Sequence, residues 1–339
     1  MSSISLKSSK VKIGVVPTHL KFVGGLVPDD EGGLPRDDSG TLKVVANLKR
    51  LQEMSPVEIS AVQIPFFSGV EEAAVAELVN GLKDLGLEVH FIMMVGGCDP
   101  MNPDDEETVV QLLVSGLVAA KAHGIQHVSS TSLEAWMQEG AIEKAGSEFD
   151  SAIQQLAKAH ARAYREAEVE GSSIQAWHIE FLRKGEFQTF TDLNRVWAFI
   201  KAANQAVGRP FFQALVDAAH CGDSELSIEE NGTIVQQLAE SNEMGIFHAS
   251  TKTTRGCFST DDGWIGGMLR HASATGKLEH VFVEFFHHQD DALAGLRELD
   301  PRHGIDTTDG RSYDELVVDG LVEVARRLNN LVARGILDA

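Results

Sequence analysis

The sequence predicts a single (β/α)8 TIM barrel, an α/β fold with eight parallel strands inside and outer helices around them. Short apolar runs alternate eight times with segments of helical period, and no low-complexity linker interrupts them. Long predicted loops follow four of the strands, at 17–40, 131–146, 249–261 and 287–311. All four fall on the side where active sites of such barrels lie. We therefore expect one domain over residues 1–339, with 1–10 as a flexible N-terminal tail.

The predicted strands are mostly near-continuous apolar runs, as expected of parallel strands covered by helices. In order they span 11–16, 57–64, 88–95, 125–130, 174–180, 211–217, 244–249 and 280–286. The predicted helices span 41–54, 70–85, 105–122, 147–170, 190–206, 227–241, 262–275 and 312–334. Apolar stripes such as Val75, Leu78, Val79 and Leu82 support the helices. Ser227 with Glu230 forms a capping-box pattern, and glycines such as Gly86 mark helix ends.

Composition excludes several classes of protein. The formal charge of −21 repels phosphate backbones, so we expect no nucleic-acid partner. No stretch of about 18 apolar residues is present, so we expect no membrane span. The first ten residues lack the apolar core of a signal peptide. Cys98, Cys221 and Cys257 are odd in number and far apart, which indicates free thiols in a reducing compartment. The predicted location is cytoplasmic.

Four polar residues end successive predicted strands in the second half of the chain: Glu180, Asp217, His248 and Glu284. They are 37, 31 and 36 residues apart, about one βα unit each. In a barrel these strand ends converge on one rim. Three carboxylates so close repel one another unless a cation lies between them. We therefore predict one divalent ion, with Mn²⁺ preferred and Mg²⁺, Co²⁺ or Zn²⁺ as alternatives.

Other residues are candidates for contact with a substrate. His220 follows Asp217 in an Asp-x-x-His pattern, and Arg183 lies shortly after Glu180. Lys252 lies in a Thr/Gly-rich loop after the seventh predicted strand, and His19 follows the first. His178, two residues before Glu180, points to the same strand face and is predicted to be a deeper supporting or core residue.

This order of strand-end residues resembles the xylose isomerase-like TIM-barrel superfamily. Its members include ketose 3-epimerases such as D-tagatose 3-epimerase, hydroxypyruvate isomerase, inosose dehydratase and endonuclease IV. The resemblance implies that Glu180, Asp217, His248 and Glu284 are metal ligands and that His220 contacts substrate. Endonuclease IV-like members carry extra histidines after strands 2 and 3 and in the loop after strand 7. Here the corresponding segments 64–68, 95–98 and 249–265 contain none. Leu182 stands where xylose isomerase has a lysine, and Arg183 does not match the spacing of the epimerase arginine.

The predicted function is that of a divalent-metal-dependent sugar or polyol isomerase or epimerase. An ion would polarise a substrate carbonyl and stabilise the enediolate, while Glu180 and Glu284 act as paired acid and base. A metal-dependent dehydratase of a keto-sugar or inosose is an alternative, because the same enediolate can lose a β-hydroxyl. A non-catalytic carbohydrate-binding barrel is a second alternative. The expected partners are a small sugar or polyol and further copies of this chain, in a homodimer or homotetramer.

Overall fold

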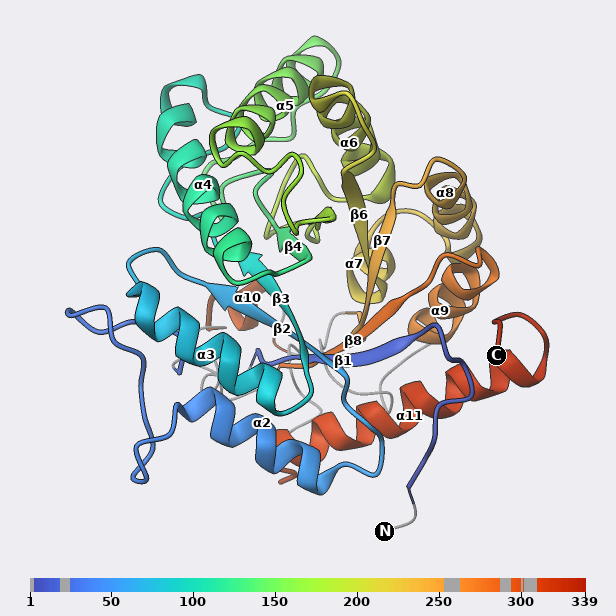
Figure 1. Cartoon of the computed structure of the whole chain (residues 1–339). Coiled ribbons are helices and arrows are strands. Elements are labelled where there is room, and N and C mark those ends of the chain that lie inside the picture. Colours follow the sequence, from blue (N-terminus) through green and yellow to red (C-terminus); the bar gives the residue numbers. More distant parts are fainter. Residues whose placement is uncertain (1–2, 19–24, 253–262, 287–293, 300, 302–309) are drawn as a thin grey trace.

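The computed structural model describes residues 3–18, 25–252, 263–286, 294–299, 301 and 310–339. Eight parallel strands pair in chain order, and β8 closes onto β1, so the predicted TIM barrel is confirmed (Figure 1). The strands are β1 (Lys12–Val16), β2 (Ala61–Phe66), β3 (Glu88–Met93), β4 (His127–Ser130), β5 (Ala176–Ile179), β6 (Phe212–Asp217), β7 (Met244–Ala249) and β8 (His280–Glu284).

Long helices surround the barrel (Figure 1). They are α2 (Lys43–Met54), α3 (Glu72–Asp84), α4 (Glu106–Ala122), α5 (Ser147–Glu166), α6 (Leu193–Val207), α8 (Ile228–Glu240), α9 (Trp264–Ala274) and α11 (Tyr313–Ala333). Among the described residues, three short helices were not predicted: η1 (Pro103–Asp105), α7 (Ala218–Asp223) and α10 (Ala294–Leu299). Short helices lack the long apolar stripe that makes a helix visible in sequence.

Local sequence signals set several of these boundaries. The predicted capping box is present: Ser227 accepts from the Glu230 N–H, and Glu230 accepts from Ser227 in return. Strand β2 differs most from its prediction, because it begins at Ala61 rather than at Val57. Val57 instead forms an isolated bridge with Ile4. The segment predicted as a flexible tail therefore makes backbone contacts from Ile4 onward.

The barrel interior consists of polar and apolar layers. Its apolar layer is a small cluster inside the strands, made of Val16, Ala61, Leu215, Ile246 and Phe282. Gly14 makes room for Phe282, because a Cβ at position 14 would lie 2.6 Å from the Phe282 ring. Polar side chains lie on both sides of this layer along the strands. One group is near the carboxyl ends of the strands and the other near their amino ends.

A separate, larger apolar core fills the space between strands and outer helices and includes Leu48, Leu113 and Trp177. Within the described ranges, no helix is long and apolar enough to cross a lipid bilayer. Cys98 and Cys221 are free thiols, as predicted, and Cys257 lies outside the described residues.

Candidate metal centre at the strand ends

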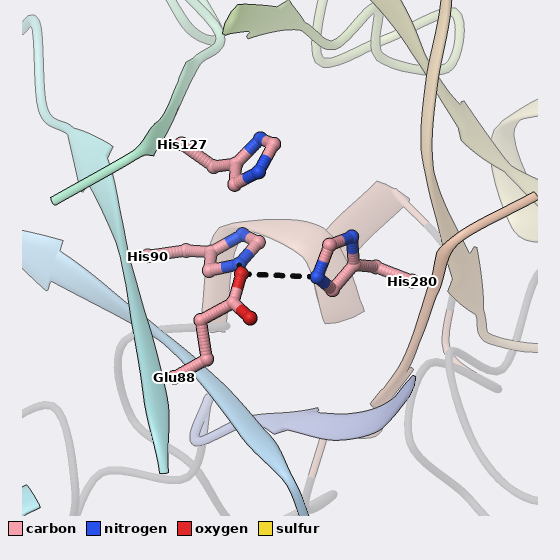
Figure 2. Close-up of side chains that lie close together, drawn as sticks. All are labelled: Glu88, His90, His127 and His280. Atoms are coloured by element: carbon pink, nitrogen blue, oxygen red, sulfur yellow. Dashed lines mark hydrogen bonds and ion pairs between the residues drawn. The ribbon is translucent and has the colours of Figure 1, made fainter. Parts of the chain in front are cut away.

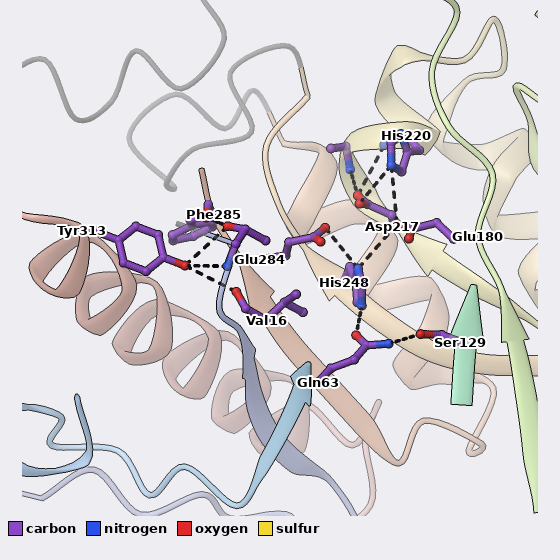
Figure 3. Close-up of polar contacts among 12 residues, drawn as sticks. Val16, Gln63, Ser129, Glu180, Asp217, His220, His248, Glu284, Phe285 and Tyr313 are labelled. Carbon is purple, nitrogen blue, oxygen red and sulfur yellow. Dashed lines mark hydrogen bonds and ion pairs between the residues drawn. The ribbon is translucent and has the colours of Figure 1, made fainter. Parts of the chain in front are cut away.

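The four strand-end residues come together in the fold (Figure 3). Asp217 and Glu284 are the last residues of β6 and β8. His248 lies in β7, the strand between them, in register with Asp217. Glu180 directly follows β5, where its N–H donates to the Ser130 carbonyl at 3.1 Å and continues the strand pairing. One ligand atom from each of the four residues lies within 4.8 Å of the others. The spacing of strand ends along the sequence thus becomes a compact cluster on one rim.

A hydrogen-bond chain from the barrel interior orients His248. The Ser129 hydroxyl donates to the Phe91 carbonyl at 3.3 Å and so accepts from Nε2 of Gln63 at 2.5 Å. The Gln63 amide oxygen therefore faces Nε2 of His248, at 2.6 Å, and accepts its proton. This bond directs Nδ1 of His248 toward the carboxylates, 3.1 Å from Oε2 of Glu284 and 3.6 Å from Oε1 of Glu180.

The electrostatics of the cluster favour a cation at its centre. Burial lowers the pKa of His248, but the carboxylates of Glu284 and Glu180 outweigh it, and that pKa lies well above its usual value. Burial raises the pKa of Glu180, but hydrogen bonds with His220 and His248 outweigh it and hold that pKa well below its usual value. The two carboxylates thus favour positive charge beside them, and a divalent ion would supply that charge.

Asp217 has two roles, because one oxygen caps a helix while the other faces the cluster. Its Oδ1 accepts from the N–H groups of Ala219 at 2.5 Å and His220 at 3.4 Å, which starts α7. Its Oδ2 lies 3.5 Å from Nε2 of His220, and the same nitrogen lies 3.5 Å from Oε1 of Glu180. The Asp-x-x-His spacing thus places His220 at the edge of the four-residue cluster.

The donor set fits a hard or borderline divalent ion. Three carboxylates and one imidazole supply oxygen and nitrogen ligands without a thiolate. Asp217 and His248 are 0% and 1% exposed, whereas Glu180 and Glu284 are both 8% exposed. The two glutamates are thus the members nearest to solvent, and a substrate entering from the rim would meet them first.

The other predicted substrate contacts have different surroundings. Arg183 is buried, with Nε 3.4 Å from Oε2 of Glu186 and a terminal nitrogen 3.9 Å from Oδ2 of Asp223. Lys252 has its ammonium 5.6 Å from the centre of the Trp264 ring, a cation–π contact. His19 lies outside the described residues. His178 is buried as predicted, and its Nε2 lies 3.1 Å from Nδ1 of His127, the first residue of β4.

Three residues that support the centre were not singled out from the sequence. Gln63 and Ser129 are polar residues inside apolar strand runs, and this interruption of the run was the available signal. The third is Tyr313, the first residue of α11 (Figure 3). Its hydroxyl lies 3.2 Å from the Thr18 nitrogen and 3.4 Å from the Val16 carbonyl oxygen, so it joins α11 to the end of β1. At that end, Val16 of β1 pairs with Glu284 of β8. No sequence signal indicates a contact between residues so far apart in the chain.

Comparisons with solved structures place the fold. No family model and no curated protein matches the sequence. An L-ribulose 3-epimerase is similar over 96% of both chains, with TM-score 0.68 and 15% identity. A D-allulose 3-epimerase from Methylomonas sp. has TM-score 0.69 and 15% identity, over 96% of this chain and 100% of that one. A sugar phosphate isomerase/epimerase from Parabacteroides distasonis has TM-score 0.59 and 12% identity, over 96% of this chain and 97% of that one.

These likenesses extend over nearly the whole chain, but the identities are low. They show that the chain shares the barrel fold of these solved structures, so the fold that the resemblance implied is confirmed.

Proposed function

We propose that the protein is a divalent-metal-dependent isomerase or epimerase of a small sugar or polyol. The observation that carries this proposal is the convergence of Glu180, Asp217, His248 and Glu284 at the carboxyl ends of the strands. Active sites of this barrel lie on that face. The shared fold with proteins described as L-ribulose and D-allulose 3-epimerases adds support by analogy.

A bound divalent ion would supply Lewis-acid polarisation of a carbonyl oxygen, which makes the neighbouring C–H more acidic. The residues of the chain would hold the substrate and move its proton. Glu180 directly follows β5 and Glu284 ends β8, at the two ends of the row β5-β6-β7-β8, and the two are the most exposed members of the cluster. One glutamate would take the proton from one face of the substrate and the other would return a proton to the opposite face, which inverts the carbon.

His220 would bind the substrate beside Glu180. Its Nε2 lies 3.5 Å from the Glu180 carboxylate, so it can orient that carboxylate or donate to a substrate hydroxyl next to it. Asp217 and His248 would hold the ion from the buried side. In this assignment Glu180 and Glu284 serve both as ligands and as acid and base.

The test is a panel of ketoses, aldoses, inososes and oxidised sugars in deuterated water with Mn²⁺. Deuterium entering a substrate C–H bond, together with an inverted or isomerised product, would support the proposal and identify the carbon. Loss of a hydroxyl from the substrate would indicate a dehydratase instead. Tight binding of a sugar without exchange of its protons would indicate a non-catalytic binding barrel and contradict the proposal.

A further inference from the structure

A second polar cluster lies at the opposite end of the barrel, in the group near the amino ends of the strands. Glu88, His127 and His280 are the first residues of β3, β4 and β8. His90 lies two residues after Glu88 and therefore on the same strand face. Figure 2 shows the side chains of Glu88, His90 and His280 pointing toward one another, with His127 beside His90.

The ligand atoms of this cluster are as close as those at the rim. One atom from each of the four residues lies within 4.8 Å of the others. Oε1 of Glu88 lies 2.8 Å from Nε2 of His90 and 3.0 Å from Nε2 of His280. The ring of His127 stacks on that of His90, with centroids 4.7 Å apart. Possible ligand atoms of three imidazoles and one carboxylate thus lie close together.

The cluster is separate from the centre at the rim. Phe282, which is fully buried in the apolar layer, lies between the two, with its ring 5.1 Å from that of His90 and 6.1 Å from that of His248. The interior of such a barrel is usually filled by branched apolar side chains. Buried histidines at the amino ends of the strands therefore differ from the usual composition of such an interior.

The hydrogen bonds between these side chains leave a buried nitrogen without a partner. His90 is 1% exposed, and its Nδ1 has no hydrogen-bond partner among the residues that the structure describes. Buried polar atoms in folded proteins are normally paired, so an unpaired ring nitrogen in a group of potential ligands points to a missing ligand. Lys12 pairs with Oε2 of Glu88 and leaves Oε1 to the histidines.

A supporting histidine orients His127. Nε2 of His178 lies 3.1 Å from Nδ1 of His127, which leaves Nε2 of His127 to bind an ion. Metal-bound histidines commonly bond through their other nitrogen to a supporting group. Position 245 must be glycine for His178 to sit there, because a Cβ would lie 2.3 Å from Nδ1 of His178.

A cavity lined in part by exposed residues borders two members of the cluster, His127 and His280. A cavity of about 270 Å³ at this end of the barrel is lined by His127, His178 and His280, together with Lys277 and Glu279. An ion could enter through it without opening the rim.

We propose that Glu88, His90, His127 and His280 form a second cation site, which takes a borderline transition-metal ion of the Zn²⁺ class. Three imidazoles and one carboxylate give the nitrogen-rich, four-ligand set that zinc prefers, in contrast to the oxygen-rich set at the rim. The site would connect β3 and β4 to β8 across the base of the barrel. Its role would be structural, because four protein ligands leave no open position for substrate.

The test begins with metal-free full-length protein, dialysed against Zn²⁺ and then analysed for bound metal. Wild type should hold about two ions per chain, and His280→Gln or His90→Gln about one. Asp217→Asn, which alters only the rim, should keep the lower ion. The matched control is His123→Gln, since His123 is partly exposed at the end of α4 and outside both clusters. Equal zinc content in wild type and His280→Gln would overturn the proposal.

Two further measurements locate the ion. Co²⁺ absorbs visible light strongly when four-coordinate and weakly when six-coordinate, so the intense bands should disappear in His280→Gln and persist in Asp217→Asn. Anomalous diffraction at the zinc absorption edge locates bound zinc in crystals of the wild-type protein. Its outcome therefore does not depend on whether a variant folds. A peak among the four side chains supports the site, and its absence from crystals grown with Zn²⁺ would refute it.

Discussion

Nε2 of His248 lies 2.6 Å from the amide oxygen of Gln63, and the two residues are 185 positions apart in the chain. This bond fixes which nitrogen of His248 carries the proton and which one faces the carboxylates. Metal-binding histidines depend on such a partner for their orientation and basicity. Gln63 is itself held by Ser129, so the metal centre depends on interior residues of β2 and β4 as well as on its own ligands.

Replacing Gln63 should therefore weaken metal binding without unfolding the barrel. We expect Gln63→Met, which keeps the length of the side chain but removes the acceptor, to lower affinity for Mn²⁺ by roughly 10- to 100-fold. Calorimetric titration of the metal-free variant measures this. The control is Gln111→Met on the outer helix α4, where Gln111 bonds only to Glu107 among the contacts described. Unchanged affinity in Gln63→Met would show that Gln63 does not orient His248.

His220 is expected to act on substrate and to leave metal binding intact. His220→Ala should keep its ion and lose roughly 10²-fold in turnover, which is typical of one positioned polar or acid–base group. Elemental analysis of the variant measures whether the ion is kept. Turnover of the substrate that the panel identifies measures the loss of activity. If the variant loses its ion, His220 is a ligand and the roles assigned to Asp217 and His220 must be revised.

The two glutamates can be separated by isotope exchange. Glu→Gln keeps the size of the side chain but cannot accept a proton at neutral pH. Glu180→Gln and Glu284→Gln should each weaken metal binding modestly and abolish net epimerisation. One of the two variants should still exchange the substrate proton with deuterated water, because the base on the other face remains. Near-normal turnover in both variants would exclude the two-carboxylate mechanism.

A buried histidine outside both clusters should make stability depend on pH. His160 is fully buried, with its ring nitrogens 2.8 Å from the Leu156 carbonyl and 2.7 Å from the Ser132 hydroxyl. Burial lowers the pKa of His160 from 6.5 to about 4. The unfolded chain therefore takes up a proton below pH 6.5 that the folded protein does not. The contribution of neutral His160 to the free energy of unfolding is fully present above pH 6.5 and is lost as the pH falls toward 4.

The size of this loss follows from the shift in pKa. Between pH 6.5 and 4 the contribution of His160 should fall by about 3 kcal/mol. Denaturant unfolding of wild type and of His160→Gln across this range measures it, since the glutamine does not titrate. The free energy of unfolding should fall by that much more in wild type than in His160→Gln. Burial also lowers the pKa of His123, but that side chain is only partly buried, so His123→Gln should stay much closer to wild type. Parallel pH profiles for wild type and His160→Gln would contradict the assignment.

The sequence by itself was enough to predict the barrel and the four residues at the rim. Apolar runs alternating with helical stripes require strands covered by helices, and the carboxyl ends of parallel strands meet on one side. A polar residue that ends such a run, as Glu180, Asp217, His248 and Glu284 do, is therefore placed at the rim by chain direction alone. The exact pairing of the strands is not needed for this inference.

Only the tertiary structure decided what lies beneath the rim. Alternation along a strand tells which residues share a face, but the neighbours across the barrel depend on strand register and closure. Gln63 of β2 reaches His248 of β7 across the interior of the closed barrel. His90 and His280 meet around Glu88 because β8 closes onto β1, which brings the two ends of the sheet together. Contacts of this kind join residues up to 192 positions apart, and no local pattern in the sequence encodes them.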